Sequence, residues 1–315
     1  MKRCMFLAIA AFASLQLFAE KKFSIGPYVS VKNGTQYEYL YSSADDDQEV
    51  SLLEWEYTPL YCVGLSLDFN RSGFNAFSKM DAAIPVSCGH MYDSDFFYVN
   101  GIKDKCNFSK SKNSCIKNFN TEIGTGYEFE ILNSFFFKPS LKFEYSYYSF
   151  KAENGRGRYG RAPYSKTGQD VNWKSENAKD VKLYGCEFKR HLFNSWVGFE
   201  TCYFVRENFN AGFSLYTNLY SYTYSIDHHL NKPTLDTYLD LGANSSFSKF
   251  RYGFFTNAGL TSRLSLNASL VFTSGNVDKG KSRYADYTKE FHRVVQKTGS
   301  NVKQMNFTIG VKFAI

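Results

Sequence analysis

After its first 19 residues the sequence has no long hydrophobic run, and this lack excludes a membrane protein built from spanning helices. Such a helix needs about 20 consecutive apolar residues, and no later stretch approaches that length. The sequence also lacks Cys-x-x-Cys pairs and histidine-containing metal spacings, so it predicts no metal site. The formal charge of +7 is modest and no basic tract is present, so the sequence argues little for a nucleic-acid partner.

The first 19 residues have the features of an export signal. Lys2 and Arg3 precede an apolar run of signal-peptide length, and Ala19 fits a cleavage point. The run is too short for a comfortable membrane-spanning helix. We therefore interpret residues 1–19 as a signal peptide and residues 20–315 as a single domain.

Six cysteines remain after the leader. Cys106 and Cys115 flank the polar stretch "NFSKSKNS", which suggests a disulfide that closes a long loop in an oxidising compartment. The other four lie in strand-like runs, where a small buried residue is the simplest interpretation; they are Cys62, Cys88, Cys186 and Cys202.

Aromatic residues make up 18% of the chain, and apolar and polar residues alternate strictly in several segments. Clear examples are "MNFTIGVKFAI" (305–315) and "RLSLNASLVF" (263–272). Alternation with a period of two and one apolar face is typical of β-strands. The sequence therefore predicts an all-β protein.

A soluble β-sandwich would show the same alternation, but three further features favour a transmembrane barrel. The alternating segments are long enough to cross a bilayer, the leader exports the chain, and short turns alternate with long polar connectors. The short turns lie at 70–73, 132–134, 206–208 and 260–263, and the long connectors near 42–48, 93–118, 153–180, 225–235 and 278–300. We therefore predict a ten-stranded antiparallel transmembrane β-barrel with long extracellular loops.

The ten strands are expected near 23–41, 49–69, 74–92, 119–132, 135–152, 181–205, 209–224, 236–260, 264–277 and 302–315. Closure of the ring satisfies every backbone donor and acceptor without water, as lipid requires. Side chains mostly fill the interior of a barrel of this size, so a wide pore is the least favoured function.

The stretch "HMYDSDFF" (90–97) places Asp93 and Asp95 two positions apart, so in a strand both side chains point to the same face. Two like charges held that close repel each other unless something uses or compensates them. The simplest interpretation is a solvated turn that ends a strand. The alternative is a functional site at the rim of the barrel.

A second polar pair occurs in "SIDHHL" (225–230), at the outer end of the seventh predicted strand. Asp227 and His229 share a face, and His228 between them points away. The third and seventh strands of a ten-strand ring lie roughly opposite each other, so the two pairs can face across the mouth. A carboxylate that orients an imidazole makes it a better general base, and a facing carboxylate can hold a water. This arrangement suits hydrolysis.

Several stretches of the chain resemble the omptin family of outer-membrane endopeptidases. They follow the family's order along nearly the whole mature chain and are "SLLEWEY" (51–57), "GHMYDSDFF" (89–97), "YYSFKAENGRGRY" (147–159), "SIDHH" (225–229), "NAGLTSRLSLNASLVFTSGNVDKG" (257–280) and "NFTIGVKF" (306–313). The resemblance implies an outer-membrane enzyme without a cofactor, whose active site faces the extracellular side.

The resemblance also implies catalytic roles for Asp93, Asp95, Asp227 and His229. A water between Asp93 and His229 would attack the scissile peptide carbonyl. Asp227 would orient His229, and Asp95 would position the water or, when protonated, stabilise the oxyanion. Two carboxylates that close should raise the pKa of one of them, which would allow that last role.

The family cleaves polypeptides between or after basic residues and uses acidic groups in its primary pocket. Glu38, in "GTQYEYLY" (34–41), matches one of these acids, and we expect it to bind substrate. The alternative is a solvated residue at the rim, which is the simplest interpretation of a glutamate among tyrosines. The second acid is replaced by Ser225, two residues before Asp227. One carboxylate should hold an arginine side chain less strongly than two. We therefore predict that the preference for cleavage at basic residues is relaxed or altered.

Family members also bind lipopolysaccharide phosphates through an outward arginine on the fifth strand. The corresponding stretch "KFEYSYYSF" (142–150) has Tyr147 at that position, with Phe143 and Tyr145 nearby. Aromatic residues at a membrane boundary form a girdle that contacts outer-membrane lipid. We therefore expect a barrel that does not depend on lipopolysaccharide.

Two functions from different classes remain open. The first is an active endopeptidase, and the second is a non-catalytic barrel of the same shape that works as a surface adhesin or receptor through its long loops. The presence of all four catalytic-type residues favours the enzyme. Loss of the second pocket acid is the one feature that favours the second alternative.

Overall fold

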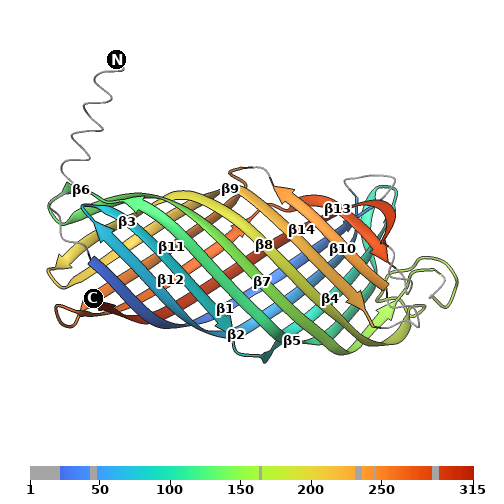
Figure 1. The fold of residues 1–315 in the computed structure, drawn as a ribbon. Helices are drawn as coiled ribbons and strands as arrows, with labels where there is room; N and C mark the ends of the chain where they lie inside the picture. Colours follow the sequence, from blue (N-terminus) through green and yellow to red (C-terminus); the bar gives the residue numbers. More distant parts are fainter. Residues whose placement is uncertain (1–21, 43–47, 163–164, 231–235, 245, 286–290) are drawn as a thin grey trace, which may run out of the picture.

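The computed structural model describes residues 22–42, 48–162, 165–230, 236–244, 246–285 and 291–315, so the predicted signal peptide lies outside the described residues. These residues form an all-β protein (Figure 1). The strands are β1 (Lys22–Tyr41), β2 (Glu49–Arg71), β3 (Phe74–Ala83), β4 (Val86–Val99), β5 (Ile102–Tyr127), β6 (Phe129–Leu132), β7 (Phe135–Tyr159), β8 (Lys179–Arg206), β9 (Phe209–His229), β10 (Asp236–Asn244), β11 (Lys249–Gly259), β12 (Leu264–Gly275), β13 (Asp278–Ala285) and β14 (Phe291–Ala314).

The strands form one closed antiparallel ring. Strands that are adjacent around the ring pair antiparallel, and β1 pairs with β14 to close it. Four strand positions are interrupted, so β3 and β4 share one position, as do β5 and β6, β10 and β11, and β12 and β13. The ring therefore has the ten positions that the alternation predicts, and the barrel prediction is confirmed.

The two ends of the barrel differ. The predicted short turns separate β2 from β3, β6 from β7, β8 from β9 and β11 from β12, all at one end. Long hairpins that include β4, β5, β7, β10 and β13 extend from the other end (Figure 1). This asymmetry is typical of outer-membrane barrels, in which the short turns face the periplasm.

The connector near 153–180 is largely a loop, as expected, between the end of β7 at Tyr159 and the start of β8 at Lys179. The connectors near 93–118 and 278–300 were also expected to be loops, and this expectation is largely wrong. The strands continue through much of these stretches, and β4 and β5 join in a tight turn at Asn100–Gly101, both with positive φ (51° and 78°). Beyond the membrane the outer face of a strand meets water and the buried inner face carries small polar residues such as Ser109, Ser111 and Asn113, so backbone pairing continues without an apolar face. The alternation of apolar and polar residues therefore ends before the strand ends. The pair Asn100–Gly101 is itself a signal for a tight hairpin turn.

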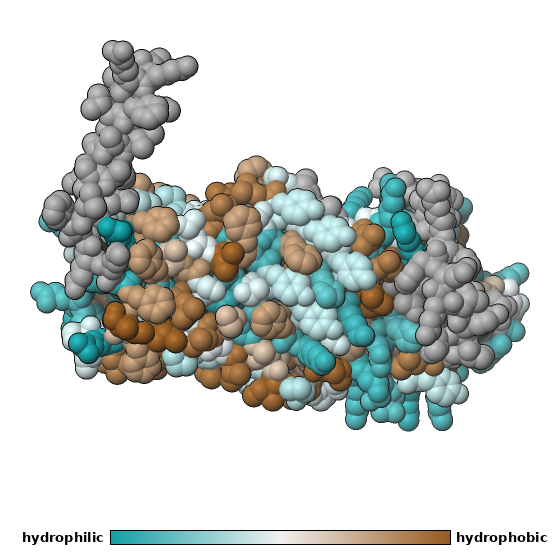
Figure 2. All heavy atoms as spheres, viewed as in Figure 1, coloured by the Kyte–Doolittle hydropathy of each residue, from teal (hydrophilic) through white to brown (hydrophobic). Residues whose placement is uncertain are grey.

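An apolar band surrounds the half of the barrel that carries the short turns. On the face shown in Figure 2, hydrophobic side chains gather over this half and hydrophilic ones at the end with the long hairpins. Large exposed apolar side chains in the band include Val29, Val63, Ile123, Phe143 and Phe254. Exposing such a surface to water costs about 25 cal/mol per Å², so this band is the part that lipid covers.

A cluster of aromatic rings on the outside marks the upper edge of this band. Tyr145 and Tyr147 on β7 contact His191 on β8, whose ring also contacts Tyr224 on β9, with centroids 4.8–6.0 Å apart. Aromatic girdles of this kind lie at membrane boundaries. Residues closer to the hairpin end, including the candidate site, therefore lie outside the membrane. The described residues contain no helix that could span a membrane.

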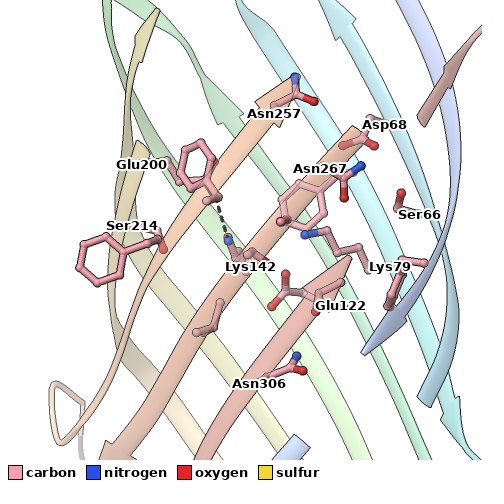
Figure 3. A pocket seen from close by; sticks show the side chains of 18 of the residues that line it. Ser66, Asp68, Lys79, Glu122, Lys142, Glu200, Ser214, Asn257, Asn267 and Asn306 are labelled. Carbon is pink, nitrogen blue, oxygen red and sulfur yellow. Dashed lines mark hydrogen bonds and ion pairs between the residues drawn. The ribbon is translucent and has the colours of Figure 1, made fainter. Parts of the chain in front are cut away.

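The lower interior is polar and holds a cavity of about 480 Å³ (Figure 3). Its lining carries charges of both signs that pair with each other, such as Lys142 with Glu200 at 3.1 Å. Buried charges need such partners, because an unpaired charge away from water is costly. Lys142 adjoins Phe143 of the apolar band, so the cavity lies within the membrane-embedded half and not at the mouth.

A layer of aromatic side chains closes the barrel above this cavity. Trp55, Tyr57 and Phe150 are at most 1% exposed, and Trp55 stacks on Phe188 with centroids 4.9 Å apart. The Tyr57 hydroxyl donates to Gln304, which lines the cavity, whereas the Trp55 indole donates to Glu38 on the far side. The layer thus separates the cavity from the mouth, and the described residues offer no wide pore.

The disulfide expected between Cys106 and Cys115 is absent, and all six described cysteines are free. Both residues lie on β5, nine positions apart, which separates them by about 30 Å of extended chain. A disulfide requires Cα atoms within about 7 Å. The prediction failed because it treated a continuous strand as a loop.

Candidate functional site

The predicted dyad lies at the end of β9. Nε2 of His229 is 2.6 Å from Oδ2 of Asp227, and Asp227 is 5% exposed. The two residues are neighbours on one face because side chains in a strand repeat every second residue. Cys186 on β8 lies opposite His229, and its thiol donates to the other carboxylate oxygen of Asp227. Both oxygens of Asp227 are therefore engaged, which fixes the plane of the carboxylate.

Asp93 and Asp95 lie within β4 and not beyond its end, which excludes the solvated turn that the D-x-D pair could have been. Nδ2 of Asn107 on β5 donates to Oδ2 of Asp95 at 2.8 Å, and both aspartates are partly buried. Burial, together with the neighbouring charge of Asp95, raises the pKa of Asp93 to about 8. Asp93 therefore holds a proton near neutral pH.

The two pairs influence each other across the mouth. A positive charge on His229 lowers the pKa of Asp93, although the opposing effects are larger. Burial alone would lower the pKa of His229, but Asp227, its hydrogen bond and the more distant Asp93 together raise it to about 9. This mutual effect indicates that the two predicted pairs face the same part of the mouth.

Glu38 is the floor of this site. It is 3% exposed, accepts a hydrogen bond from Trp55 Nε1 at 3.0 Å, and lies in the field of Asp227. Burial raises the pKa of Glu38 well above its ordinary range, and Asp227 adds to the rise. The predicted substrate-binding residue therefore lies below the dyad, but it is enclosed.

Arg190 on β8 is a site residue that sequence reasoning missed. Its side chain is fully buried, Nε donates to Ser225 Oγ at 2.9 Å, and Nη2 lies 3.8 Å from Glu38 Oε1. Asp240 on β10, paired with Ser225, is also buried, which raises its pKa to about 6. The one signal in the sequence was strand alternation. Arg190 lies four residues after Cys186 on β8, so both side chains point to the same face of the strand.

Cys186, Asp227 and His229 form a group that could hold a metal ion. One donor atom from each lies within 4.8 Å of the others, so sulfur, oxygen and nitrogen converge. These are the donor types that zinc accepts. The sequence predicted no metal site because its spacing rules look along one segment, whereas this group forms across two paired strands.

The other histidines whose side chains the structure describes do not join the site. His90 is on β4, where its ring is 3.8 Å from Glu56, and His191 belongs to the outer aromatic cluster. Both are strand residues, as expected. His228 faces away from Asp227 and His229 by strand alternation, and the side chain of His292 is not among those described.

Comparisons with known proteins agree with this fold. The model of the Omptin family matches residues 19–315. No curated protein matches the chain. Among solved structures, outer membrane protease OmpT from Escherichia coli superposes with a TM-score of 0.78 at 13% identity, over 93% of this chain and 97% of that one. OprG from Pseudomonas aeruginosa reaches a TM-score of 0.35 at 10% identity, over 94% and 96% of the two chains.

Proposed function

Because the chain belongs to the Omptin family, we propose that it is an outer-membrane endopeptidase that acts through Asp93, Asp95, Asp227 and His229. The observation that carries the proposal is the 2.6 Å bond between Asp227 and His229 at the mouth, within electrostatic range of Asp93. The fold shared with the protease OmpT supports it. A surface receptor would have no need for these polar groups to converge.

The chemistry follows from the hydrogen bonds. Asp227 accepts the Nε2 proton of neutral His229, which leaves Nδ1 to act as the base. A water held by Nδ1 and the Asp93–Asp95 pair gives its proton to the imidazole while its oxygen attacks the peptide carbonyl carbon. The proton on the aspartate pair hydrogen-bonds to the resulting oxyanion. His229 then returns its proton to the leaving amine as the peptide bond breaks.

The proposal includes an extracellular position for the site. It is supported by the location of the four residues at the end of the barrel with the long hairpins, because short turns face the periplasm in outer-membrane barrels. The aromatic cluster around Tyr147 lies between this end and the apolar band. The four residues thus lie beyond the lipid, where a polypeptide substrate could approach.

The direct test is cleavage of unlabelled peptides by refolded protein, beside Asp93→Ala and His229→Ala. Each substitution should reduce kcat/KM by at least a thousandfold, because each removes a partner of the attacking water. His191→Ala is the matched control, since His191 lies outside the barrel in the aromatic cluster and should retain activity. Folded wild-type protein that cleaves no peptide would instead favour the adhesin or receptor.

A further inference from the structure

An extended peptide across the mouth would direct one side chain next to the scissile bond down into the barrel. Alternate side chains of an extended chain point in opposite directions. Ser225 lies two residues before Asp227 on the same inner face of β9, so it forms part of what that side chain would meet. Glu38 on β1 and Arg190 on β8 form the rest.

This floor is already occupied by a cation of the protein itself. The Arg190 guanidinium donates to Ser225 through Nε, and through Nη1 to Gln36 Oε1 at 3.1 Å and to the Tyr37 carbonyl at 3.0 Å. It therefore lies between Ser225 and Glu38. Arg190, Ser225 and Gln36 are 0% exposed, so the guanidinium is held in place by packing as well as by hydrogen bonds.

The contact between Arg190 and Glu38 leaves one hydrogen-bond donor atom of the arginine and one acceptor atom of the glutamate without a hydrogen bond in the part of the chain that the structure describes. Nη2 of Arg190 and Oε1 of Glu38 are buried without a hydrogen-bond partner among the described residues, and they face each other at 3.8 Å. A buried donor and acceptor without partners are costly.

A charged substrate side chain would meet a like charge on this floor. A lysine or arginine would be placed against Arg190 in a site closed to water, where repulsion between like charges is weakly screened. A carboxylate would meet Glu38, Asp227 and Asp240. Both signs of charge are therefore disfavoured.

We propose that Arg190 is a specificity-determining residue that fills the acidic floor of the site, so that the enzyme prefers a neutral side chain there and rejects basic ones. This inference rests on the proposed endopeptidase function and names its substrate class. It also gives a structural cause for the altered preference that replacement of the second acid by Ser225 predicts: the serine accepts a hydrogen bond from the cation that the protein supplies.

The test is a set of peptides that differ only in the residue before the scissile bond, which is Arg, Lys, Gln, Leu or Glu. Wild-type kcat/KM should be at least tenfold higher for Gln or Leu than for Arg, Lys or Glu. Arg190→Ala should raise kcat/KM for the Arg peptide at least tenfold, because the substrate can then reach Glu38. Adding Glu38→Gln to that variant should remove the gain, because the carboxylate that holds the substrate arginine is lost. Guanidinium at low millimolar concentration should also suppress the gain, because it can occupy the space that Arg190 leaves.

Lys189→Ala is the matched control, since Lys189 adjoins Arg190 on β8 but is exposed on the outer face, and it should leave the profile unchanged. Wild-type protein that cleaves the Arg peptide best would overturn the inference while the endopeptidase stands. An Arg190→Ala variant that folds but gains nothing would overturn it as well. If that variant does not refold, the wild-type profile alone decides, and failure to cleave any peptide would overturn both proposals.

Discussion

The pH dependence of cleavage follows from the charge on His229. The imidazole must be neutral to accept a proton from water, but Asp227 and Asp93 stabilise its charged form and raise its pKa from 6.5 to about 9. Each pKa unit corresponds to about 1.4 kcal/mol, so the interaction is on the order of 3 kcal/mol in favour of the protonated ring. Near pH 7 most of the free enzyme therefore holds the wrong protonation state.

The expected profile of kcat/KM rises from pH 6 to a maximum between about pH 8 and 9 and falls above it, because His229 must be neutral while Asp93 keeps the proton that binds the oxyanion. The apparent pKa values of the rise and the fall lie between about 8 and 9, and they belong to the coupled system of His229 and Asp93 and not to one residue. Replacing Asp227 with Asn removes the main stabilising charge. The rise should then move to lower pH, and the maximum rate should fall by roughly 10⁴ because the ring loses its correct tautomer.

The assay is the initial rate of peptide cleavage under kcat/KM conditions in detergent, from pH 5 to pH 10, with circular dichroism to confirm folding at each pH. A profile that is highest at pH 5–6 and falls above pH 7 would refute the assignment of His229 as the base. A profile in Asp227→Asn that keeps its rise at the wild-type position would refute the cause given for the raised pKa.

Two further predictions concern the surroundings of the site. Micromolar zinc should inhibit cleavage by binding Cys186, Asp227 and His229. The Cys186→Ala variant should need at least tenfold more zinc for the same inhibition and should lose less than tenfold in kcat/KM. Equal zinc sensitivity of the variant and the wild type would exclude the thiol as a ligand. Because Tyr147 belongs to an aromatic cluster on the lipid-facing surface, lipopolysaccharide added to protein refolded without it should change kcat/KM less than twofold, and a large gain would show that the lipid is required.

The ten barrel positions were predictable because lipid enforces alternation. Strands such as β12 and β14 must turn an apolar face outward, so their residues alternate visibly along the sequence. The extension of β4 and β5 beyond the membrane was not predictable in this way, since the outer face there meets water and the buried inner face carries polar residues such as Ser109 and Asn113. The error about Cys106 and Cys115 has the same origin.

The candidate site was predictable where it is local in sequence. Asp93 with Asp95, and Asp227 with His229, are separated by two positions, so strand geometry alone places each pair on one face. Cys186 and Arg190 were missed because their contacts with Asp227 and Glu38 depend on how β8 pairs with β9 and on closure of the ring through β1. The register, that is, which residues of two paired strands lie opposite each other, cannot be derived from the sequence of one strand alone.

The most direct measurement of the central claim is a high-resolution crystal structure of the refolded barrel at pH 9. We predict a single ordered water within hydrogen-bond distance, about 3 Å, of both Nδ1 of His229 and a carboxylate oxygen of Asp93. Separation of these two groups by more than about 7 Å, or an imidazole that points away from Asp93, would contradict the proposed mechanism.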